Sequence, residues 1–150
     1  MDAITLTLPW PVSSNRYWRT FMPKGFKAPV TTLSKEAKDY KQAVGSLAKE
    51  AGISEPISGR VAVSYVLYPQ RPQDWAKRAA KDPVRWDDSV QCLDLDNALK
   101  VTLDSLKGVV FGDDKFVFEI HGKRAEPDGV GRMVVTVSPI ISQSHQPALI

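Results

Sequence analysis

The chain is poor in metal-binding soft ligands: it has one cysteine, Cys92, and two histidines among 150 residues. A single cysteine forms no internal disulfide and completes no cysteine zinc site, which is typical of a cytosolic protein. No apolar run approaches the roughly 20 residues that span a bilayer. The N-terminus lacks a basic stretch followed by an apolar core, so it does not have the pattern of a secretory signal. The sequence therefore predicts a cytoplasmic protein with no membrane segment.

The composition is that of an ordinary globular chain, with 43% hydrophobic and 25% charged residues. A length of 150 residues is enough to bury a real core in one domain. The last residues are rich in Ser, Gln and Pro and lack an apolar pattern. We expect a single domain over residues 1–138 and a loose C-terminal tail over 139–150.

Charge is unevenly distributed along the chain. Residues 1–49 carry eight Lys or Arg against three acids, a net charge of +5. Residues 87–114 carry seven Asp against two Lys, a net charge of −5. A basic region beside a concentrated acidic one suits a polyanion-binding surface around a cation site. Two solvated faces of opposite sign would give the same composition.

The apolar patterning predicts an α/β (α+β) fold in the order β-loop-α-β-loop-α-β-β. Ser34 is the expected N-cap of the first helix and Gly52 its expected stop; Gly108 is the expected C-cap of the second helix. We expect both helices to pack on a small mixed sheet, and the last two strands to form an antiparallel hairpin. The expected strands are 3–8, 60–68, 113–123 and 132–138, and the expected helices are 35–51 and 95–107.

The second expected helix has a polar side. Asp94 and Asp96 stand just before it, where an extended backbone points side chains i and i+2 the same way. Within the helix, Asp96, Lys100 and Asp104 follow an i, i+4, i+8 spacing. Leu95, Leu99, Leu103 and Leu106 take a neighbouring face, which we expect to pack on the sheet.

A second acidic pair, Asp113 and Asp114, begins a strand. If Asp114 reaches Asp94 and Asp96, three carboxylates converge and require a compensating cation. Oxygen ligands without nearby His or Cys favour Mg²⁺, or Mn²⁺, over zinc. Such a site suits phosphodiester hydrolysis. Each piece also has a plainer interpretation, because Asp before a helix often caps it and Asp-Asp after Gly often forms a turn.

The segment between the first strand and the first helix is basic and aromatic. Arginine forks clamp phosphates and aromatic rings stack on unpaired bases, so this segment is a candidate for DNA contact. Two lysines one helical turn apart on residues 35–51 could follow a DNA arm. The candidate DNA-binding residues are Asn15, Arg16, Tyr17, Arg19, Lys38 and Lys41.

Three motifs resemble the RusA family of Holliday-junction resolvases: LPWPVSSNRYWR, DLDNALKVTLDSLKG and VVFGDDKFV, in this order over most of residues 4–137. The resemblance implies a homodimeric, bacterial or phage-encoded nuclease that resolves four-way DNA junctions by paired nicks in recombination and repair. It implies that Asp94, Asp96 and Asp114 bind Mg²⁺ and that Lys100 acts near the scissile phosphate, with no nucleotide cofactor. Asn97, Asp104 and Asp113 would support these residues. Residues 69–91 depart from this pattern, because a shorter basic stretch is expected before D-L-D.

Two other functions fit parts of the sequence. One is a non-catalytic junction-binding or nucleic-acid-binding domain in which the acids only cap helices. The other is a glycosyltransferase-type D-x-D site that holds a metal and a nucleotide sugar, which fits poorly because the chain has no evident nucleotide-binding unit.

Overall fold

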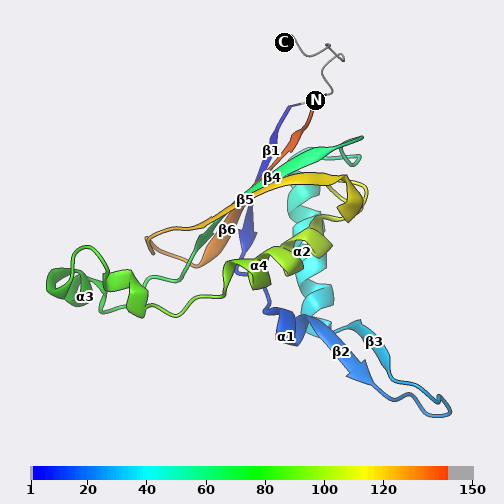
Figure 1. Ribbon diagram of the computed structural model, residues 1–150, viewed down its shortest axis with the longest axis horizontal. Helices are drawn as coiled ribbons and strands as arrows, with labels where there is room; N and C mark the ends of the chain where they lie inside the picture. Colours follow the sequence, from blue (N-terminus) through cyan, green and yellow to red (C-terminus); the bar gives the residue numbers. More distant parts are fainter. Residues whose placement is uncertain (1, 142–150) are drawn as a thin grey trace, which may run out of the picture.

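Four strands form the central sheet of the computed structural model, which describes residues 2–141 (Figure 1). The strands lie in the order β1-β6-β4-β5, with β4 antiparallel to β6 and parallel to β5. This mixed sheet confirms the predicted fold class. The strands are β1 (Ile4–Pro9), β4 (Val61–Tyr68), β5 (Val117–Arg124) and β6 (Arg132–Pro139).

The predicted hairpin of the last two strands is wrong. Strand β4 lies between β5 and β6 and pairs with both along its length. The connection between β5 and β6 (residues 125–131) therefore crosses over the end of β4, where the Ala125 amide donates to the Leu67 carbonyl. The turn residues in that connection would also allow a hairpin. Strands β5 and β6 do not pair with each other because β4, which is distant in the sequence, packs between them.

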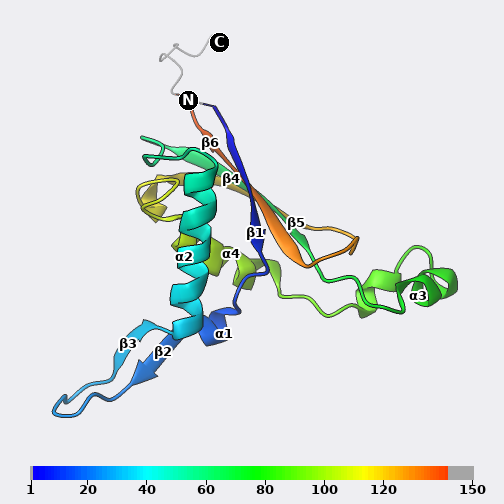
Figure 2. The ribbon, with the colours of Figure 1, turned by 180° about the vertical axis from the view of Figure 1, so that it is seen from behind.

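One face of the sheet carries the core. In β4 the side chains alternate, with Val61, Val63, Tyr65 and Leu67 buried and the intervening residues more exposed. Two helices cover this face, α2 (Lys35–Glu50) and α4 (Leu95–Leu106). The predicted N-cap is confirmed, since the Ser34 hydroxyl accepts the Ala37 amide at 3.1 Å. Figure 2 shows α2 from behind, crossing the strands.

The buried face of α2 follows a helical period, whereas that of α4 is rotated from the leucine face that the sequence predicted. In α2 the buried residues are Ala37, Tyr40, Val44 and Ala48. In α4 they are Ala98, Val101, Thr102, Ser105 and Leu106. The other leucines of α4 are only partly buried and pack at the edge of the core. Thr102 and Ser105 are tolerated inside because their hydroxyls are bonded to Met133 Sδ and the Val101 carbonyl.

Two segments project from this body in different directions (Figure 1). One is an arm, residues 18–33, made of β2 (Trp18–Phe21) and β3 (Val30–Leu33), which pair only with each other. A short helix, α1 (Ser14–Tyr17), precedes the arm. The sequence predicted only a loop here.

The other projection is the excursion, residues 69–91, which contains α3 (Trp75–Lys81) and a 3₁₀ turn, η1 (Trp86–Ser89). Residues 75–81 are thus helical inside a segment that the sequence predicted as a loop. The excursion is tied to the rest of the chain: buried Trp86 donates Nε1 to Glu126 Oε1 at 2.8 Å, and Arg124 donates to the carbonyls of Asp87 and Val90. The predicted long loop therefore holds a helix and a 3₁₀ turn and is bonded to β5 and to the β5–β6 connection.

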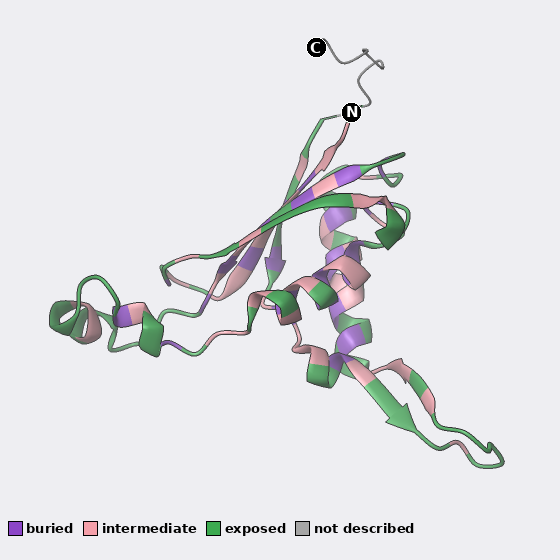
Figure 3. Ribbon diagram, in the orientation of Figure 1, coloured by how far each residue is buried: buried purple, intermediate pink, exposed green. Residues whose placement is uncertain are grey.

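Strand β5 is the edge of the sheet and is exposed along most of its length. Phe118 is 55% exposed and Ile120 is 50% exposed, although both are large apolar residues. Phe118 lies where the pairing of β5 with β4 shifts register, between Val117 and Glu119. A second 3₁₀ turn, η2 (Asp114–Phe116), leads into β5. Figure 3 shows this strand mostly in the colour of exposed residues, in contrast to β4.

No helix within residues 2–141 is long and apolar enough to cross a membrane. Of the predicted tail, residues 142–150 lie outside the described part of the chain. Pro139 still belongs to β6, so the last strand runs one residue past the predicted domain end.

Candidate functional site

The two aspartates of the D-x-D motif begin α4. Asp94 is the N-cap residue, with extended backbone angles, but its side chain accepts no backbone hydrogen bond. Asp96 lies in the first turn of the helix. Both residues are exposed, and neither forms an ion pair within the described chain. The capping interpretation is therefore not supported for Asp94, whose carboxylate is free to bind a ligand.

Tyr65 on β4 fixes the position of this helix start. Its hydroxyl donates to the carbonyl of Leu95, between the two aspartates, at 3.0 Å. Its ring lies over Gly122 of β5, where a Cβ would come within 2.4 Å of the ring. Burial, and then the nearby charge of Asp96, raise the pKa of Tyr65 above its ordinary value. The tyrosine therefore remains a neutral donor beside the acidic pair.

Asn97 connects the same helix start to α1. Its Oδ1 accepts the backbone amide of Ser14 at 2.8 Å. This bond places the basic segment around α1 directly beside the acidic pair. Asn97 was predicted to support the metal ligands, and in this structure its side-chain oxygen is used to join two elements.

The two aspartates of the second acidic pair, Asp113 and Asp114, have different contacts. Asp113 accepts the Lys115 amide at 3.2 Å and caps η2, as the turn interpretation predicts. Asp114 is the first residue of η2, is exposed, and has no ion-pair partner within residues 2–141. Of the two, Asp114 is the carboxylate left free for a ligand.

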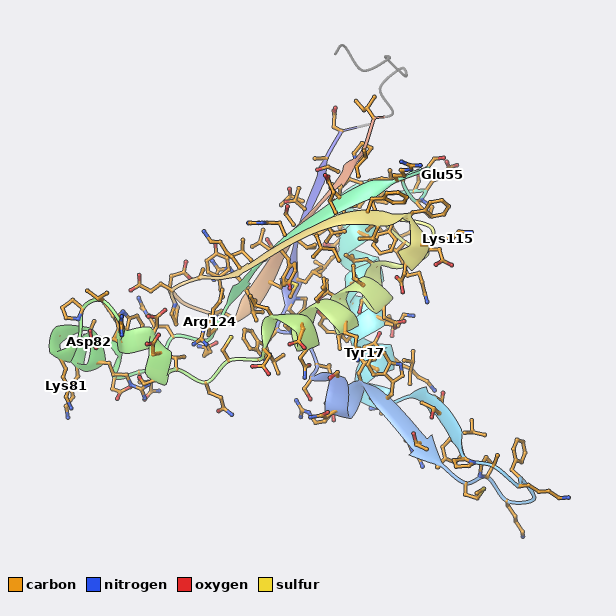
Figure 4. All side chains as sticks on the ribbon, viewed as in Figure 1. Tyr17, Glu55, Lys81, Asp82, Lys115 and Arg124 are labelled. Atoms are coloured by element: carbon orange, nitrogen blue, oxygen red, sulfur yellow. The ribbon has the colours of Figure 1, made fainter. Side chains whose placement is uncertain are left out.

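Asp114 does not join Asp94 and Asp96 in one chain. Among residues 2–141, no three His, Cys, Asp or Glu side chains are close enough to hold a metal ion together. The 12 residues of α4 separate the two sites by about 18 Å along the helix. Asp114 comes after the C-terminal end of α4, where Lys107 and Phe111 form an isolated β-bridge. Figure 4 labels Lys115, its neighbour, on that side of the molecule.

Asp104 has different partners from those predicted. It accepts a short hydrogen bond from the Tyr17 hydroxyl and lies 3.6 Å from Lys41 Nζ and 3.9 Å from Lys107 Nζ. Burial and the bond to Asp104 raise the pKa of Tyr17 well above its ordinary value. Asp104 on α4 is thus held by Tyr17 of α1, Lys41 of α2 and Lys107 directly after α4, and it joins α1 and α2 to α4.

This cluster corrects two predicted DNA contacts. The Tyr17 side chain is fully buried, so it cannot stack on a base. Lys41 is partly buried and engaged with Asp104. Both residues contribute to the anchoring of α1 instead.

The remaining basic candidates lie on the surface. Arg16 is exposed and pairs loosely with Glu36 at 3.6 Å, while Arg19 lies over the ring of Phe21. Asn15, Lys38 and Lys100 are also exposed. Lys100 forms no ion pair with Asp96 in the described chain, so it is available to an incoming phosphate.

A cavity of about 770 Å³ opens between this site and the excursion. Trp10, Arg16, Arg78 and Cys92 are among the residues that line it. Burial raises the pKa of the Cys92 thiol, which suits a packed cysteine better than a nucleophile. The cavity, Tyr65 and Gly122 were not anticipated from the sequence; a glycine inside a strand pattern was the one available signal.

The chain matches known proteins over most of its length. Residues 9–138 match the sequence model of the family described as Endodeoxyribonuclease RusA. Curated relatives named "Crossover junction endodeoxyribonuclease RusA" from Escherichia coli K12 and Escherichia coli O1:K1 are 29% identical over 102 residues. A Shigella sonnei protein of the same name has the same identity. Each match covers 63% of this chain and 80% of the relative.

Proposed function

Because this chain belongs to the Endodeoxyribonuclease RusA family, we propose that it is a divalent-cation-dependent nuclease that resolves four-way DNA junctions by paired nicks. It would act in recombination and repair in a bacterial cytoplasm, encoded by host or phage. The observation that carries this proposal is the free acidic pair at the start of α4, with Asp94 not used as a cap. Uncompensated carboxylates beside a basic surface suit a cation that also meets a phosphate.

Asp94 and Asp96 supply two oxygen ligands suited to Mg²⁺ or Mn²⁺. A cation held there would favour ionisation of water and offset the charge that develops on the phosphate. Asp114 is the third of the predicted metal ligands, but it lies beyond the opposite end of α4 from Asp94 and Asp96. One copy of the chain therefore holds an incomplete ligand set.

We infer that a second copy supplies the missing carboxylate. The free edge of β5 offers unpaired backbone groups and the exposed side chains of Phe118 and Ile120. An edge strand with unpaired backbone groups is a template for pairing with another chain. Antiparallel pairing of β5 with the same strand of a second copy gives a twofold homodimer.

The direction of β5 makes this pairing relevant to the site. The strand starts three residues after Asp114 and ends at Arg124, which bonds the carbonyl of Val90, four residues before Asp94. Figure 4 labels Lys115 and Arg124 at the two ends of the strand. Reversing the strand in a partner brings the partner's Asp114 toward Asp94 and Asp96. Two equivalent sites result, which suits two symmetric nicks.

Surface cations would hold the DNA backbone around each site. Arg16 and Lys38 are exposed on α1 and α2, which pack against α4, and Arg19 is exposed on β2 of the arm. Asn15 can donate to a phosphate oxygen. Lys100 lies one turn after Asp96 and would stabilise the scissile phosphate. Asp113 would support its neighbour Asp114 through its fixed turn.

The direct test is cleavage of a synthetic mobile four-way junction and of a matched linear duplex, with Mg²⁺ or with EDTA. We expect paired nicks in the junction only, and only with the metal. Asp96→Asn should abolish cleavage and leave junction binding unchanged or tighter, because a charge that repels phosphate is removed. Tight binding with no cleavage in any metal would instead indicate a non-catalytic junction-binding protein.

Mixing two inactive variants tests the shared site. Asp96→Asn and Asp114→Asn proteins, mixed and allowed to exchange subunits, should recover nicking, because one of the two sites then contains only native carboxylates. The matched control mixes Asp94→Asn with Asp96→Asn, which leaves every site defective and should recover nothing. Failure of the first mixture, with subunit exchange demonstrated, would show that each site is built from a single chain.

A further inference from the structure

The arm, residues 18–33, carries a surface that the catalytic assignment does not explain. Its turn, residues 22–29, exposes Met22 by 56% and Phe26 by 61%, and Phe21 on β2 is 36% exposed. Gly25 has a φ of +86°, and the Phe26 amide bonds the Pro23 carbonyl, so the tip is a defined tight turn. An isolated two-stranded ribbon buries no core, so these side chains do not stabilise the fold.

The positive charge near the tip indicates which class of partner the tip suits. Residues 3–35 contain no Asp or Glu, and five cations lie among them: Arg16, Arg19, Lys24, Lys27 and Lys35. Lys24 and Lys27 flank Phe26 directly and are exposed. Arg16 and Lys35 near the root pair with Glu36 and Asp39, whereas the cations of the arm itself, Arg19, Lys24 and Lys27, form no ion pair in the described chain. Unpaired cations around apolar side chains suit a polyanion that also offers flat apolar groups. Nucleic acid has both, in its phosphates and its bases.

The arm is rigidly attached beside the acidic pair. At its root, the Ser34 amide donates to the Tyr17 carbonyl at 2.9 Å, and the Ser34 hydroxyl donates to the Arg16 carbonyl at 2.6 Å. Buried Tyr17 packs edge-on against Trp18 at 4.6 Å and bonds Asp104 of α4. A rigid root fixes the distance between the tip and the start of α4.

We propose that the tip of the arm is a wedge, with Met22 and Phe26 inserting between bases at the branch point of a DNA junction while Lys24 and Lys27 contact the flanking phosphates. This proposal rests on the proposed junction-resolving function. Eight residues separate Trp18 from Phe26, so the tip reaches at most about 26 Å from the root. Apolar wedges of this kind unstack a base step and open the duplex next to it.

The test uses a four-way junction with 2-aminopurine, whose fluorescence rises on unstacking, at the branch point. Binding and fluorescence are measured in EDTA, so that no strand is cut. We expect the wild-type protein to raise the fluorescence severalfold. The double variant Met22→Ser, Phe26→Ser should still bind the junction, with an affinity within about 5-fold of wild type, and lose most of the fluorescence rise. The matched control is Val84→Ser, an 84% exposed apolar residue in the excursion, which should behave as wild type.

A full fluorescence rise with the double variant would overturn the wedge. So would loss of self-association in that variant with unchanged junction opening, which would show that the tip contacts a second copy instead. Metal-dependent cleavage by the wild-type protein is measured in parallel. If the wild type cleaves junctions and only the fluorescence prediction fails, the wedge alone is wrong. If the wild type neither binds nor cleaves junctions, the proposed function fails, and the wedge fails with it.

Discussion

At the scale of single residues, Tyr65 links the sheet to the acidic pair. Its ring occupies the space that a side chain at position 122 would need, and its hydroxyl holds the Leu95 carbonyl. The tyrosine therefore helps to fix where Asp94 and Asp96 lie. In the proposed nuclease we assign it the role of a positioning residue.

Removing the Tyr65 hydroxyl should affect the rate of junction cleavage more than the stability of the fold. Tyr65→Phe is expected to lower the free energy of unfolding by about 1 kcal/mol and to lower kcat for junction cleavage without a matching change in junction affinity. Tyr68→Phe is the control, because the Tyr68 hydroxyl has no hydrogen-bond partner in the described chain and the residue lies on the opposite face. Cleavage at the wild-type rate by the Tyr65 variant would show that the helix start is held by other contacts.

Two buried tyrosines predict a loss of stability in alkali. Burial raises the pKa of Tyr40, and burial with the bond to Asp104 raises the pKa of Tyr17, whereas both groups have a pKa of about 10 when unfolded. Their contribution is complete below pH 10 and is lost as pH rises from there toward the higher native pKa, because only the unfolded chain can ionise. Urea unfolding at pH 8 and pH 11 measures this loss. Tyr40→Phe should reduce the difference between the two pH values, and an unchanged difference would contradict the assignment.

At the scale of elements, the N-terminus of α2 also closes the base of the arm. Ser34 accepts the Ala37 amide as an N-cap and donates to the Arg16 carbonyl on the other side of the hairpin. One side chain thus starts a helix and joins it to the segment that leaves α1.

Ser34→Ala should remove both bonds. We expect the free energy of unfolding to fall by about 1–2 kcal/mol, measured by urea denaturation. Ser46→Ala, on the exposed side of the same helix, should change stability by less than about 0.5 kcal/mol. Equal effects of the two substitutions would mean that the cap contributes nothing specific.

At the scale of the whole molecule, the homodimer that we propose depends on the free edge of β5. Phe118 is exposed near the start of β5, a strand with one unpaired edge, where an added charge would oppose pairing with a second copy.

Phe118→Arg should therefore yield a folded monomer that does not cleave junctions. Sedimentation gives the mass and circular dichroism confirms the fold, while the cleavage assay reports activity. Val84→Arg introduces the same charge at an exposed apolar site in the excursion and should leave both mass and cleavage unchanged. A dimeric, active Phe118 variant would place the interface elsewhere.

Local signals in the sequence were sufficient for most elements. The Ser34 cap, the period of α2, the β-branched run of β4 and the acidic start of α4 are all encoded within a few residues. The free aspartates could be named because residue type and spacing alone identify a candidate ligand set. The arm was missed because its short strands carry a weak pattern and pair only with each other.

The sequence by itself determined where the two main helices and the strands of the central sheet approximately lie, which carboxylates are candidates, and which family the motifs resemble. The strand expected from residue 113 begins only at Val117, because Asp114–Phe116 form a 3₁₀ turn. Tertiary structure decided the rest: the insertion of β4 between β5 and β6, the rotated core face of α4, the burial of Tyr17, and the separation of Asp114 from the other two aspartates. The physical reason is the distance along the chain over which each kind of interaction acts. Caps and periodicity act over one or two helical turns, whereas strand order, burial and convergence of side chains depend on contacts between residues far apart in the chain.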